Sequence, residues 1–379
     1  DLLATFRSRA AKYDRENSFF VEDFEDLKRI GYLKMVVPEE FGGRGFTLAQ
    51  AAREQRRLAE YAPATALAVN MHVYWTGVAA DMRRMGDASL EWLLREAGQG
   101  EVFAAGHGES GNDLPLFLST SRAERADGGY RFYGHKIFGS LSPVWTRLGL
   151  HGMDTSDPAN PKIVHAFLPR SAQGYTIKET WDTLGMRATR SDDTILDGAF
   201  VPDRYVSRVI GAGQADLFVL CVFAWGLGGF AGVYTGLARR ALDLAVATAH
   251  KRTSLALSRS MAYHPEVQHN VAEMVMTLEA IDAQFERLID DWSAGADYGH
   301  NWPMKIVAAK HNAVEGAKSI VDKAMAISGG SGMFKGQELE RLYRDVRAGG
   351  FHPANTLLAY EIVGKIGLGI DLGEQPRWG

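Results

Sequence analysis

Two histidines lie where their neighbours could prepare them for proton transfer. His352 precedes Pro353, and residues 353–369 have the pattern of a helix with proline at its first position. The positive end of a helix dipole disfavours imidazolium, so His352 would stay neutral and could accept a proton near pH 7. His72 lies on an apolar helical segment, where histidine is more often a core residue. We predict His352 as a general base and His72 as a polar group of the same pocket.

A second candidate pair combines an aromatic ring with a hydroxyl group. Phe138 and Ser140 are two positions apart, so on a β-strand both side chains would point to the same face. An aromatic ring and a hydroxyl on one face suit a planar ligand, although a core phenylalanine beside a surface serine is equally consistent with the pair alone. The glycine-rich run 103–113 precedes this pair, but such a run by itself is a weak signal.

The composition narrows the class of protein. A chain of 379 residues with 46% hydrophobic content can bury a large core in two or three domains. Lys and Arg number 42 against 46 Asp and Glu, and no basic run contains interleaved aromatics, which disfavours nucleic acid as a partner. The single cysteine, Cys221, excludes an internal disulfide and a multi-cysteine metal site. We therefore expect a cytoplasmic protein without a metal centre.

The hydrophobic pattern divides the chain into three parts. Apolar residues recur at helical spacing over 1–98, short alternating strands fill 99–210, and long helical patterns return over 211–379. The predicted fold is mainly α with a central β domain. Residues 217–238 are uncharged and long enough to cross a bilayer. We interpret them as a glycine-interrupted loop that enters a buried bundle helix, and expect no membrane contact.

Four motifs, in order, resemble the acyl-CoA dehydrogenase superfamily. Residues 103–113 resemble its L-T-E-P-G-A-G-S-D run, and residues 134–143 resemble its G-x-K-x-[FW]-I-[TS]-N-G strand. Residues 184–191 resemble L-G-x-R-x-[ST]-x-[ST], and residues 326–355 resemble the C-terminal signature with its glycine turn and E-R-L-Y-R-D-x-R helix. The resemblance implies an N-terminal helical domain, a β-barrel-like middle domain and a C-terminal four-helix bundle, assembled as a homotetramer.

The resemblance also implies a flavin cofactor and the residues around it. It places Phe138 against the isoalloxazine, Ser140 at flavin N5 and Arg252 on the pyrophosphate of a neighbouring subunit's flavin. Altered residues such as Pro265 weaken the expected contacts with the adenylate half of FAD, so FAD and FMN both remain open. A separate reductase could supply the flavin in reduced form. The other expected cofactor-binding residues are Phe103, Ala105, Gly106, Gly329 and Gly330, and the expected substrate-binding residues are Trp75, Asn112 and Asn355.

The residue that defines ordinary acyl-CoA dehydrogenation is missing. Pro353 stands nine residues after Arg344, where most members carry the glutamate that removes the substrate α-proton, and Gly226 stands at the alternative position. The remaining pattern is most similar to the two-component flavin monooxygenases of this fold, which oxidise small organic substrates with reduced flavin and O2. The first alternative is an acyl-CoA dehydrogenase whose base is relocated to Glu109 or is His352 itself. The second is an inactive flavin-binding scaffold.

Overall fold

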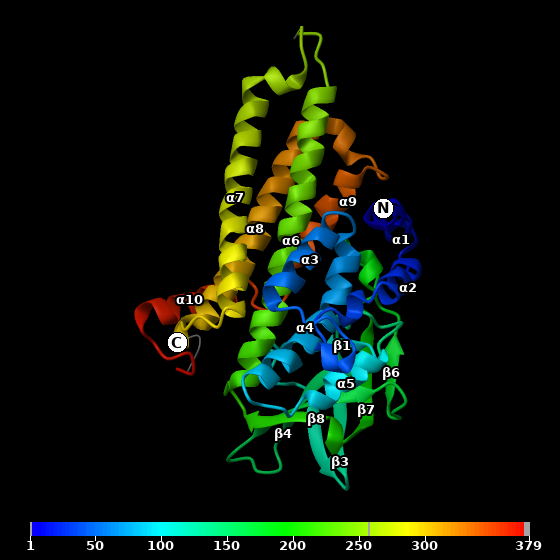
Figure 1. Ribbon diagram of the computed structural model, residues 1–379, viewed down its shortest axis with the longest axis vertical. Helices are drawn as coiled ribbons and strands as arrows, with labels where there is room; N and C mark the ends of the chain where they lie inside the picture. The colour runs from blue at the N-terminus through cyan, green and yellow to red at the C-terminus, as the bar shows by residue number, and fades with distance from the viewer. Residues whose placement is uncertain (1, 257, 375–379) are drawn as a thin grey trace.

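The computed structural model describes residues 2–256 and 258–374, which form helices above and around one central sheet (Figure 1). The first part of the chain is helical, as predicted. Helix α3 begins at a capping box, in which the Thr47 side chain accepts from the Gln50 backbone and the Gln50 side chain accepts from the Thr47 backbone. Helix α4 begins with proline at its first position and is buried over most of its length. The N-terminal helices are α1 (Leu2–Glu16), α2 (Val21–Arg29), α3 (Leu48–Ala59), α4 (Pro63–Arg84) and α5 (Glu91–Gln99).

The middle of the chain forms a mixed sheet. Its strands are ordered β6-β7-β3-β2-β4-β5-β8, and β1 pairs in parallel with β4. Strands β2 and β3 form a hairpin, because Ala126 pairs with Gly129 across a two-residue turn in which Gly128 has φ 71°. The strands are β1 (Phe103–Gly106), β2 (Arg122–Ala126), β3 (Gly129–Lys136), β4 (Arg147–Asp154), β5 (Lys162–Pro169), β6 (Tyr175–Lys178), β7 (Asp193–Pro202) and β8 (Val206–Gly211).

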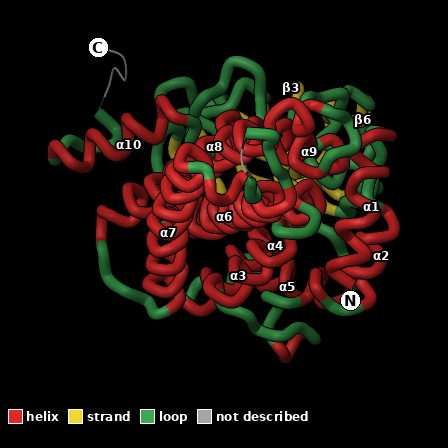
Figure 2. The backbone as a smooth tube through the Cα atoms, turned by 90° about the horizontal axis from the view of Figure 1, so that it is seen from above, coloured by secondary structure: helices red, strands yellow, loops and turns green. Residues whose placement is uncertain are grey.

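The last part of the chain is a bundle of long helices. Helices α6 (Leu217–Lys251), α7 (Pro265–Ser293) and α8 (Trp302–Ser328) pack side by side, and the shorter α9 (Glu338–Asp345) lies beside α8. Helix α10 (Thr356–Leu368) packs against α8 and extends away from the body (Figure 2). The predicted mainly α fold with a central sheet is confirmed. The exact domain boundaries remain a prediction.

Helix α6 corrects one expectation. The glycine-rich residues 217–238 are not a loop but the first two thirds of one continuous helix. Helix α6 is the one helix among the described residues long and apolar enough to cross a membrane, and 83% of its most apolar stretch is buried inside the protein. A Cβ on Gly229 would lie 2.0 Å from Asn70 Oδ1, and a Cβ on Gly236 would lie 2.2 Å from the Arg56 carbonyl oxygen. The glycines therefore allow α3 and α4 to approach α6 closely.

Candidate active site

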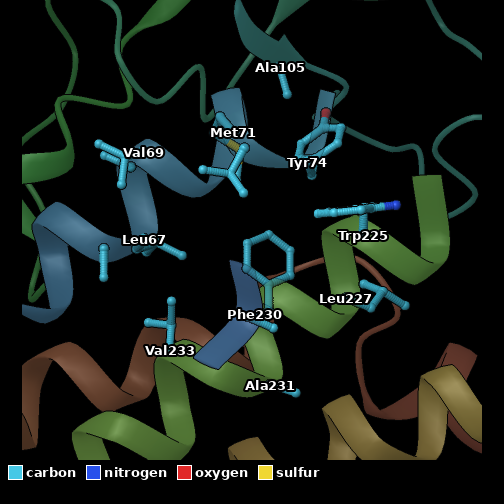
Figure 3. Packing of buried hydrophobic residues seen from close by; sticks show 14 of the residues in the cluster. Leu67, Val69, Met71, Tyr74, Ala105, Trp225, Leu227, Phe230, Ala231 and Val233 are labelled. Carbon is cyan, nitrogen blue, oxygen red and sulfur yellow. The ribbon is translucent and has the colours of Figure 1, made fainter. Parts of the chain in front are cut away.

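A cavity of about 550 Å³ lies between α4, α6, the β1 end of the sheet and the segment before α10. Its walls are mainly apolar, and its volume is typical of a small-molecule site. Figure 3 shows Phe230 projecting from α6 toward Met71 and Tyr74 of α4, with Ala105 of β1 beyond them. The polar or ionisable residues in the lining include His107, Glu109, Asn112, Asp113, Ser140, Thr183, Thr189, Ser191, Arg344, Arg347, His352 and Asn355.

Helix α6 holds the ring of His352 from two sides. The Tyr234 hydroxyl lies 2.8 Å from His352 Nε2, and the Phe230 ring stacks on the imidazole with centroids 4.5 Å apart and planes 11° apart. Phe230 and Tyr234 are four residues apart, so they share one face of the helix. If Nε2–H donates to the Tyr234 oxygen, Nδ1 carries a lone pair. In this tautomer His352 can accept a proton from a molecule in the cavity.

The predicted start of the last helix is wrong. Helix α10 begins at Thr356, and Asn355 is its N-cap, whose Oδ1 accepts from the Leu358 backbone N–H at 3.0 Å. His352 therefore lies before the N-cap residue and outside the first turn of α10, where the helix dipole mainly acts. Asn355 lines the cavity as predicted, but its side-chain oxygen caps the helix and does not remain for a substrate.

Lys310 fixes the segment that carries His352. Its Nζ donates to the carbonyl oxygens of Gly349 at 3.2 Å, His352 at 3.3 Å and Ala354 at 3.0 Å. Burial lowers the pKa of Lys310 to about 7. Burial, reinforced by the Lys310 charge, lowers the pKa of His352 to about 3, so the imidazole is neutral at pH 7 for this reason and not through a helix dipole. The sequence offered one signal, since Lys310 shares a buried helical face with Ile306 and Ala313.

Phe138 and Ser140 both line the cavity, although not in the predicted strand geometry. Strand β3 ends at Lys136, and Phe138 has φ 59°, so the two side chains are presented by a turn. Phe138 is 54% exposed and meets Trp181 edge to face at 5.9 Å. A large aromatic side chain left uncovered in an apolar cavity suits contact with a flat aromatic ligand.

A chain of hydroxyl groups runs back from Ser140. Its Oγ lies 2.7 Å from Ser191 Oγ, which lies 2.7 Å from Thr189 Oγ1. The Thr189 hydroxyl then donates to the Met186 carbonyl oxygen at 2.8 Å. Ser191 and Thr189 belong to the segment 184–191 that resembles a family motif, but nothing in the sequence connects them with Ser140.

His72 lies outside the cavity in which it was predicted as a polar group. The residue is 1% exposed and does not line the cavity. The Phe103 backbone N–H donates to its Nδ1 at 3.0 Å, and its Nε2 lies 2.7 Å from the Leu33 carbonyl oxygen. Because a carbonyl can only accept, Nε2 must carry the proton, and the ring is neutral. Burial lowers the pKa of His72 to about 4. His72 therefore joins two backbone segments and has a structural role.

Alanine at position 72 is accordingly expected to reduce stability rather than catalysis. His72→Ala leaves the Phe103 N–H and the Leu33 carbonyl without their buried partner. An unsatisfied buried group typically costs about 1–3 kcal/mol. Urea unfolding should show a loss of about 2–6 kcal/mol for the two groups together, while flavin affinity of the folded variant stays close to wild type. A large loss of turnover with unchanged stability would contradict the structural role.

Three other residues with predicted contacts do not line the cavity, namely Trp75, Phe103 and Gly106, and their contacts with a cofactor or substrate stay predictions. Trp75 donates its Nε1–H to the Ala104 carbonyl oxygen at 3.0 Å and packs against Phe167. Phe103 is fully buried in the same aromatic core, and a side chain at Gly106 would face Leu148. Ala105, between them, does line the cavity. Its predicted contact with a cofactor stays a prediction.

Asn112 and Glu109 belong to one saturated loop. Asn112 Nδ2 donates to Glu109 Oε2 at 2.9 Å and to the Leu118 carbonyl oxygen at 2.8 Å, and its Oδ1 accepts from the Leu114 N–H at 3.0 Å. Asn112 therefore ties the loop together, and its predicted substrate contact is not supported. Glu109 accepts further hydrogen bonds from Ser119 Oγ, Thr120 N, Ser121 N, Ser121 Oγ and Lys136 Nζ.

The same contacts make Glu109 unsuitable as a relocated base. Burial opposes ionisation of this carboxyl, but the Lys136 ammonium and the surrounding donors outweigh it and lower the pKa to about 2. A carboxylate with so low a pKa and so many donors is a weak proton acceptor. Pro353 and Gly226 carry no carboxylate, and the Glu109 carboxylate is too weak a base to remove an α-proton.

The predicted phosphate-binding residues lie away from the cavity. Arg252 is exposed after the end of α6, and its Nη1 donates to the Ile327 carbonyl oxygen at 2.6 Å. Gly329 has φ 60°, and a Cβ there would lie 3.0 Å from Arg252 Nη1. Gly330 follows in the same turn. The contact of this arginine with a neighbouring subunit stays a prediction.

His107 lines the cavity, and the buried His151 and His165 follow it in a row. His107 Nδ1 is 3.2 Å from His151 Nδ1, and the His151 ring stacks on His165 with centroids 5.8 Å apart. Burial holds the pKa of His107 and of His151 well below the usual range, and lowers the pKa of His165 to about 3. Among the described residues, no group of His, Cys, Asp and Glu is placed to hold a metal ion.

His165 is expected to weaken the fold in acid. Its ring nitrogens make no hydrogen bond within ordinary geometric limits, so His165→Leu should be near neutral in stability at pH 7.5. Between pH 6.5 and about 3 the unfolded wild-type chain binds a proton at this residue and the folded chain does not. The free energy of unfolding of the variant should therefore rise relative to that of wild type by up to about 1.4 kcal/mol per pH unit as the pH falls. Chemical unfolding at pH 7.5 and pH 5 measures this, and an equal difference at both would contradict it.

The comparisons with known families match both helical parts of this chain. The family described as acyl-CoA dehydrogenase, N-terminal domain, matches residues 4–89, and the C-terminal domain of the same family matches residues 228–356. The fold and the cavity between these parts are those of a flavin-dependent oxidoreductase. The chain belongs to the acyl-CoA dehydrogenase superfamily, and its cofactor is a flavin.

The similar proteins include enzymes that are not dehydrogenases by name. The chain is 29% identical over 395 residues to an L-evernosamine nitrososynthase of Micromonospora sp., covering 98% of this chain and 90% of that protein. It is 27% identical over 390 residues to a dibenzothiophene monooxygenase of Rhodococcus qingshengii, covering 96% and 90%. The solved structure of KijD3 with FMN and a dTDP-linked amino keto sugar superimposes with a TM-score of 0.85 at 26% identity, covering 98% of this chain and 92% of that chain.

The lining of the cavity fits a flavin ring. Phe138 and Trp181 offer aromatic surface, Met186 adds an apolar contact, and Ser140 supplies a polar group next to them. Apolar walls with a few placed polar groups are what a largely flat heteroaromatic ring requires. These residues would hold the ring, and His352 lies in the lining of the same cavity.

Proposed function

We propose that this protein is a monooxygenase that uses reduced flavin and O2 to oxidise a small organic substrate. The observation that carries the proposal is the neutral, tightly oriented His352 in a cavity that has Pro353 and Gly226 where the family carries its glutamate and in which Glu109 is held by many donors. Desaturation of a thioester needs a base at the α-carbon, whereas oxygenation needs a proton acceptor for the substrate and a site that excludes water. The named activities of the nitrososynthase and monooxygenase relatives support the same reaction class.

The residues of the chain divide the work between them. A reduced flavin, when bound, would supply the electrons that allow O2 to react. Phe138, Trp181 and Met186 would hold its ring, and the apolar side chains of α4 and α6 keep water away from the reacting atoms. His352 accepts a proton from the substrate at Nδ1, while Tyr234 holds Nε2. Lys310 keeps the backbone of this segment in place.

The charges around the cavity favour a substrate without phosphate groups. The two arginines in the described lining are already paired: Arg344 with Asp14 and Glu340, and Arg347 with Asp322. His352, the histidine oriented toward a substrate, is neutral at pH 7. A dianionic pyrophosphate would therefore find no unpaired cation among the described lining residues. We infer an uncharged, mainly apolar substrate.

We also infer a separate flavin reductase as partner and a homotetrameric assembly.

The competing function is acyl-CoA dehydrogenation with His352 as the base. The chain lacks the carboxylate that most of the family carries at the position of Pro353 or, alternatively, of Gly226, which disfavours this function. The two functions differ in what reduces the flavin. An acyl-CoA would do so directly in a dehydrogenase, whereas the monooxygenase requires flavin that is already reduced.

One experiment separates these functions. The protein is loaded anaerobically with reduced FMN or FAD, and O2 is admitted in a stopped-flow instrument while the flavin absorbance is followed. We expect an oxygen-dependent spectrum that persists before oxidised flavin returns. In parallel, protein with oxidised flavin is mixed anaerobically with straight and branched acyl-CoAs. We expect no bleaching within minutes, and bleaching within seconds would overturn the monooxygenase proposal.

A further inference from the structure

We propose that the hydroxyl chain from Ser140 through Ser191 to Thr189 makes this site select reduced flavin over oxidised flavin. The proposal rests on the proposed function in one respect, namely that the flavin's central ring lies against Ser140. The linked hydroxyl groups select the reduced flavin by fixing the direction in which the Ser140 hydroxyl proton points. Ser140 is thereby left as a hydrogen-bond acceptor toward the cavity.

The direction follows from counting protons. Each hydroxyl has one proton to donate, and a carbonyl oxygen can only accept. Thr189 gives its proton to the Met186 carbonyl at 2.8 Å, so the 2.7 Å contact between Thr189 and Ser191 must use the Ser191 proton. The 2.7 Å contact between Ser191 and Ser140 must then use the Ser140 proton. Only lone pairs of Ser140 remain for a ligand.

The end of the chain is anchored, so it cannot easily reverse. The Met186 carbonyl also accepts from Trp181 Nε1 at 3.2 Å, and the Met186 N–H donates to Asp345 Oδ1 at 2.5 Å. Thr189 is fully buried, and Ser191 and Ser140 are 3% and 8% exposed, so water hardly competes for these hydroxyls.

The backbone holds the two serines together. The turn that carries Ser140 is tied to the segment that carries Ser191 on both sides, because Gly139 N–H donates to the Asp192 carbonyl at 3.3 Å and Leu141 N–H donates to the Thr189 carbonyl at 3.2 Å. This arrangement is unusual enough to require left-handed backbone at Leu141 and Arg190, with φ 67° and 42°. The geometry of the chain is therefore built in before any ligand binds.

A fixed acceptor distinguishes the two redox states of a flavin. Oxidised flavin has a lone pair at N5, which would oppose the lone pairs of Ser140. Two-electron reduction adds a proton at N5, and the resulting N–H can donate to Ser140. A site of this kind binds the reduced flavin that a reductase delivers and releases the oxidised flavin after turnover.

The test measures binding of both redox states without substrate or O2. We expect wild type to bind reduced FMN at least tenfold more tightly than oxidised FMN. Ser191→Ala frees the Ser140 proton, so oxidised FMN should bind more tightly. The ratio of the affinity for reduced FMN to the affinity for oxidised FMN should then fall at least fivefold. A tenfold ratio corresponds to a midpoint potential of bound FMN about 30 mV above that of free FMN, which gives an independent readout.

Two further variants control for general damage to the site. Ser191→Thr keeps a hydroxyl at the same place and should retain the ratio. Ser142→Ala removes a buried hydroxyl of the same turn, one that donates to Asp192 and does not line the cavity, and should leave the ratio unchanged. Equal affinity for both redox states in wild type, or an unchanged ratio in Ser191→Ala, would overturn the proposal. Selective binding of reduced FMN without any oxygenation would overturn the proposed function alone.

Discussion

Replacement of His352 by alanine is expected to lower substrate turnover by about 10²- to 10⁴-fold, the usual effect of removing a general base. The ring is stacked on Phe230 and bonded to Tyr234, so its orientation is set before a substrate enters. Alanine removes the proton acceptor and leaves the residues beside Ser140 unchanged. Product formation should therefore collapse while the affinity for reduced flavin stays within a few-fold of wild type. Steady-state product analysis and anaerobic flavin titration measure the two effects.

Tyr234→Phe is the matched control for this prediction. It keeps the aromatic volume and removes only the hydroxyl that meets His352 Nε2. Without it Nε2 loses its hydrogen-bond partner while the stacking on Phe230 remains, so turnover should fall less than in His352→Ala. Oxygen consumption should continue in both variants, with H2O2 released in place of product. Near-normal product formation by His352→Ala would show that the histidine only packs on α6.

The architecture could be predicted from the sequence because the hydrophobic patterns that indicate it are local. The two changes of hydrophobic period, from helical to alternating and back to helical, depend on near neighbours in the chain. The glycine-rich start of α6 was misjudged for the opposite reason. Glycine weakens an isolated helix, and only the close approach of α3 and α4 makes it the required residue there.

The candidate site was predictable where a side chain acts directly on the cavity. His352, Phe138, Ser140 and Ala105 could be found by comparing types and spacings, and all four line the cavity. His72 was misplaced because its partners, the Leu33 carbonyl and the Phe103 N–H, are backbone atoms that carry no sequence signal.

Residues that act through others escaped for the same reason. Tyr234, Lys310 and the pair formed by Thr189 and Ser191 lie far from His352 or Ser140 in the sequence and meet them only in the fold. Each of them holds a ring, a backbone position or a proton direction in place. Such roles become visible only when hydrogen-bond donors and acceptors are counted in three dimensions.

Lys136→Met is expected to reduce the free energy of unfolding by about 3–5 kcal/mol at pH 7, because it leaves the buried Glu109 carboxylate without its cation. Both side chains of the pair are fully buried. Burial lowers the pKa of Lys136 to about 8, but the Glu109 charge keeps it protonated at pH 7. The double variant Lys136→Met, Glu109→Gln removes both charges and should recover most of the loss.

The pH dependence makes this last prediction specific. Without Lys136 the pKa of Glu109 should rise above its unfolded value, because burial then dominates over the remaining donors. A group whose folded pKa is raised gains stability as the pH falls, so the deficit of Lys136→Met should shrink from pH 7 toward pH 5. Urea unfolding of wild type and both variants at these two pH values measures the change. A constant deficit would mean that Glu109 is not a buried charge, and would reopen its candidacy as a catalytic base for acyl-CoA dehydrogenation.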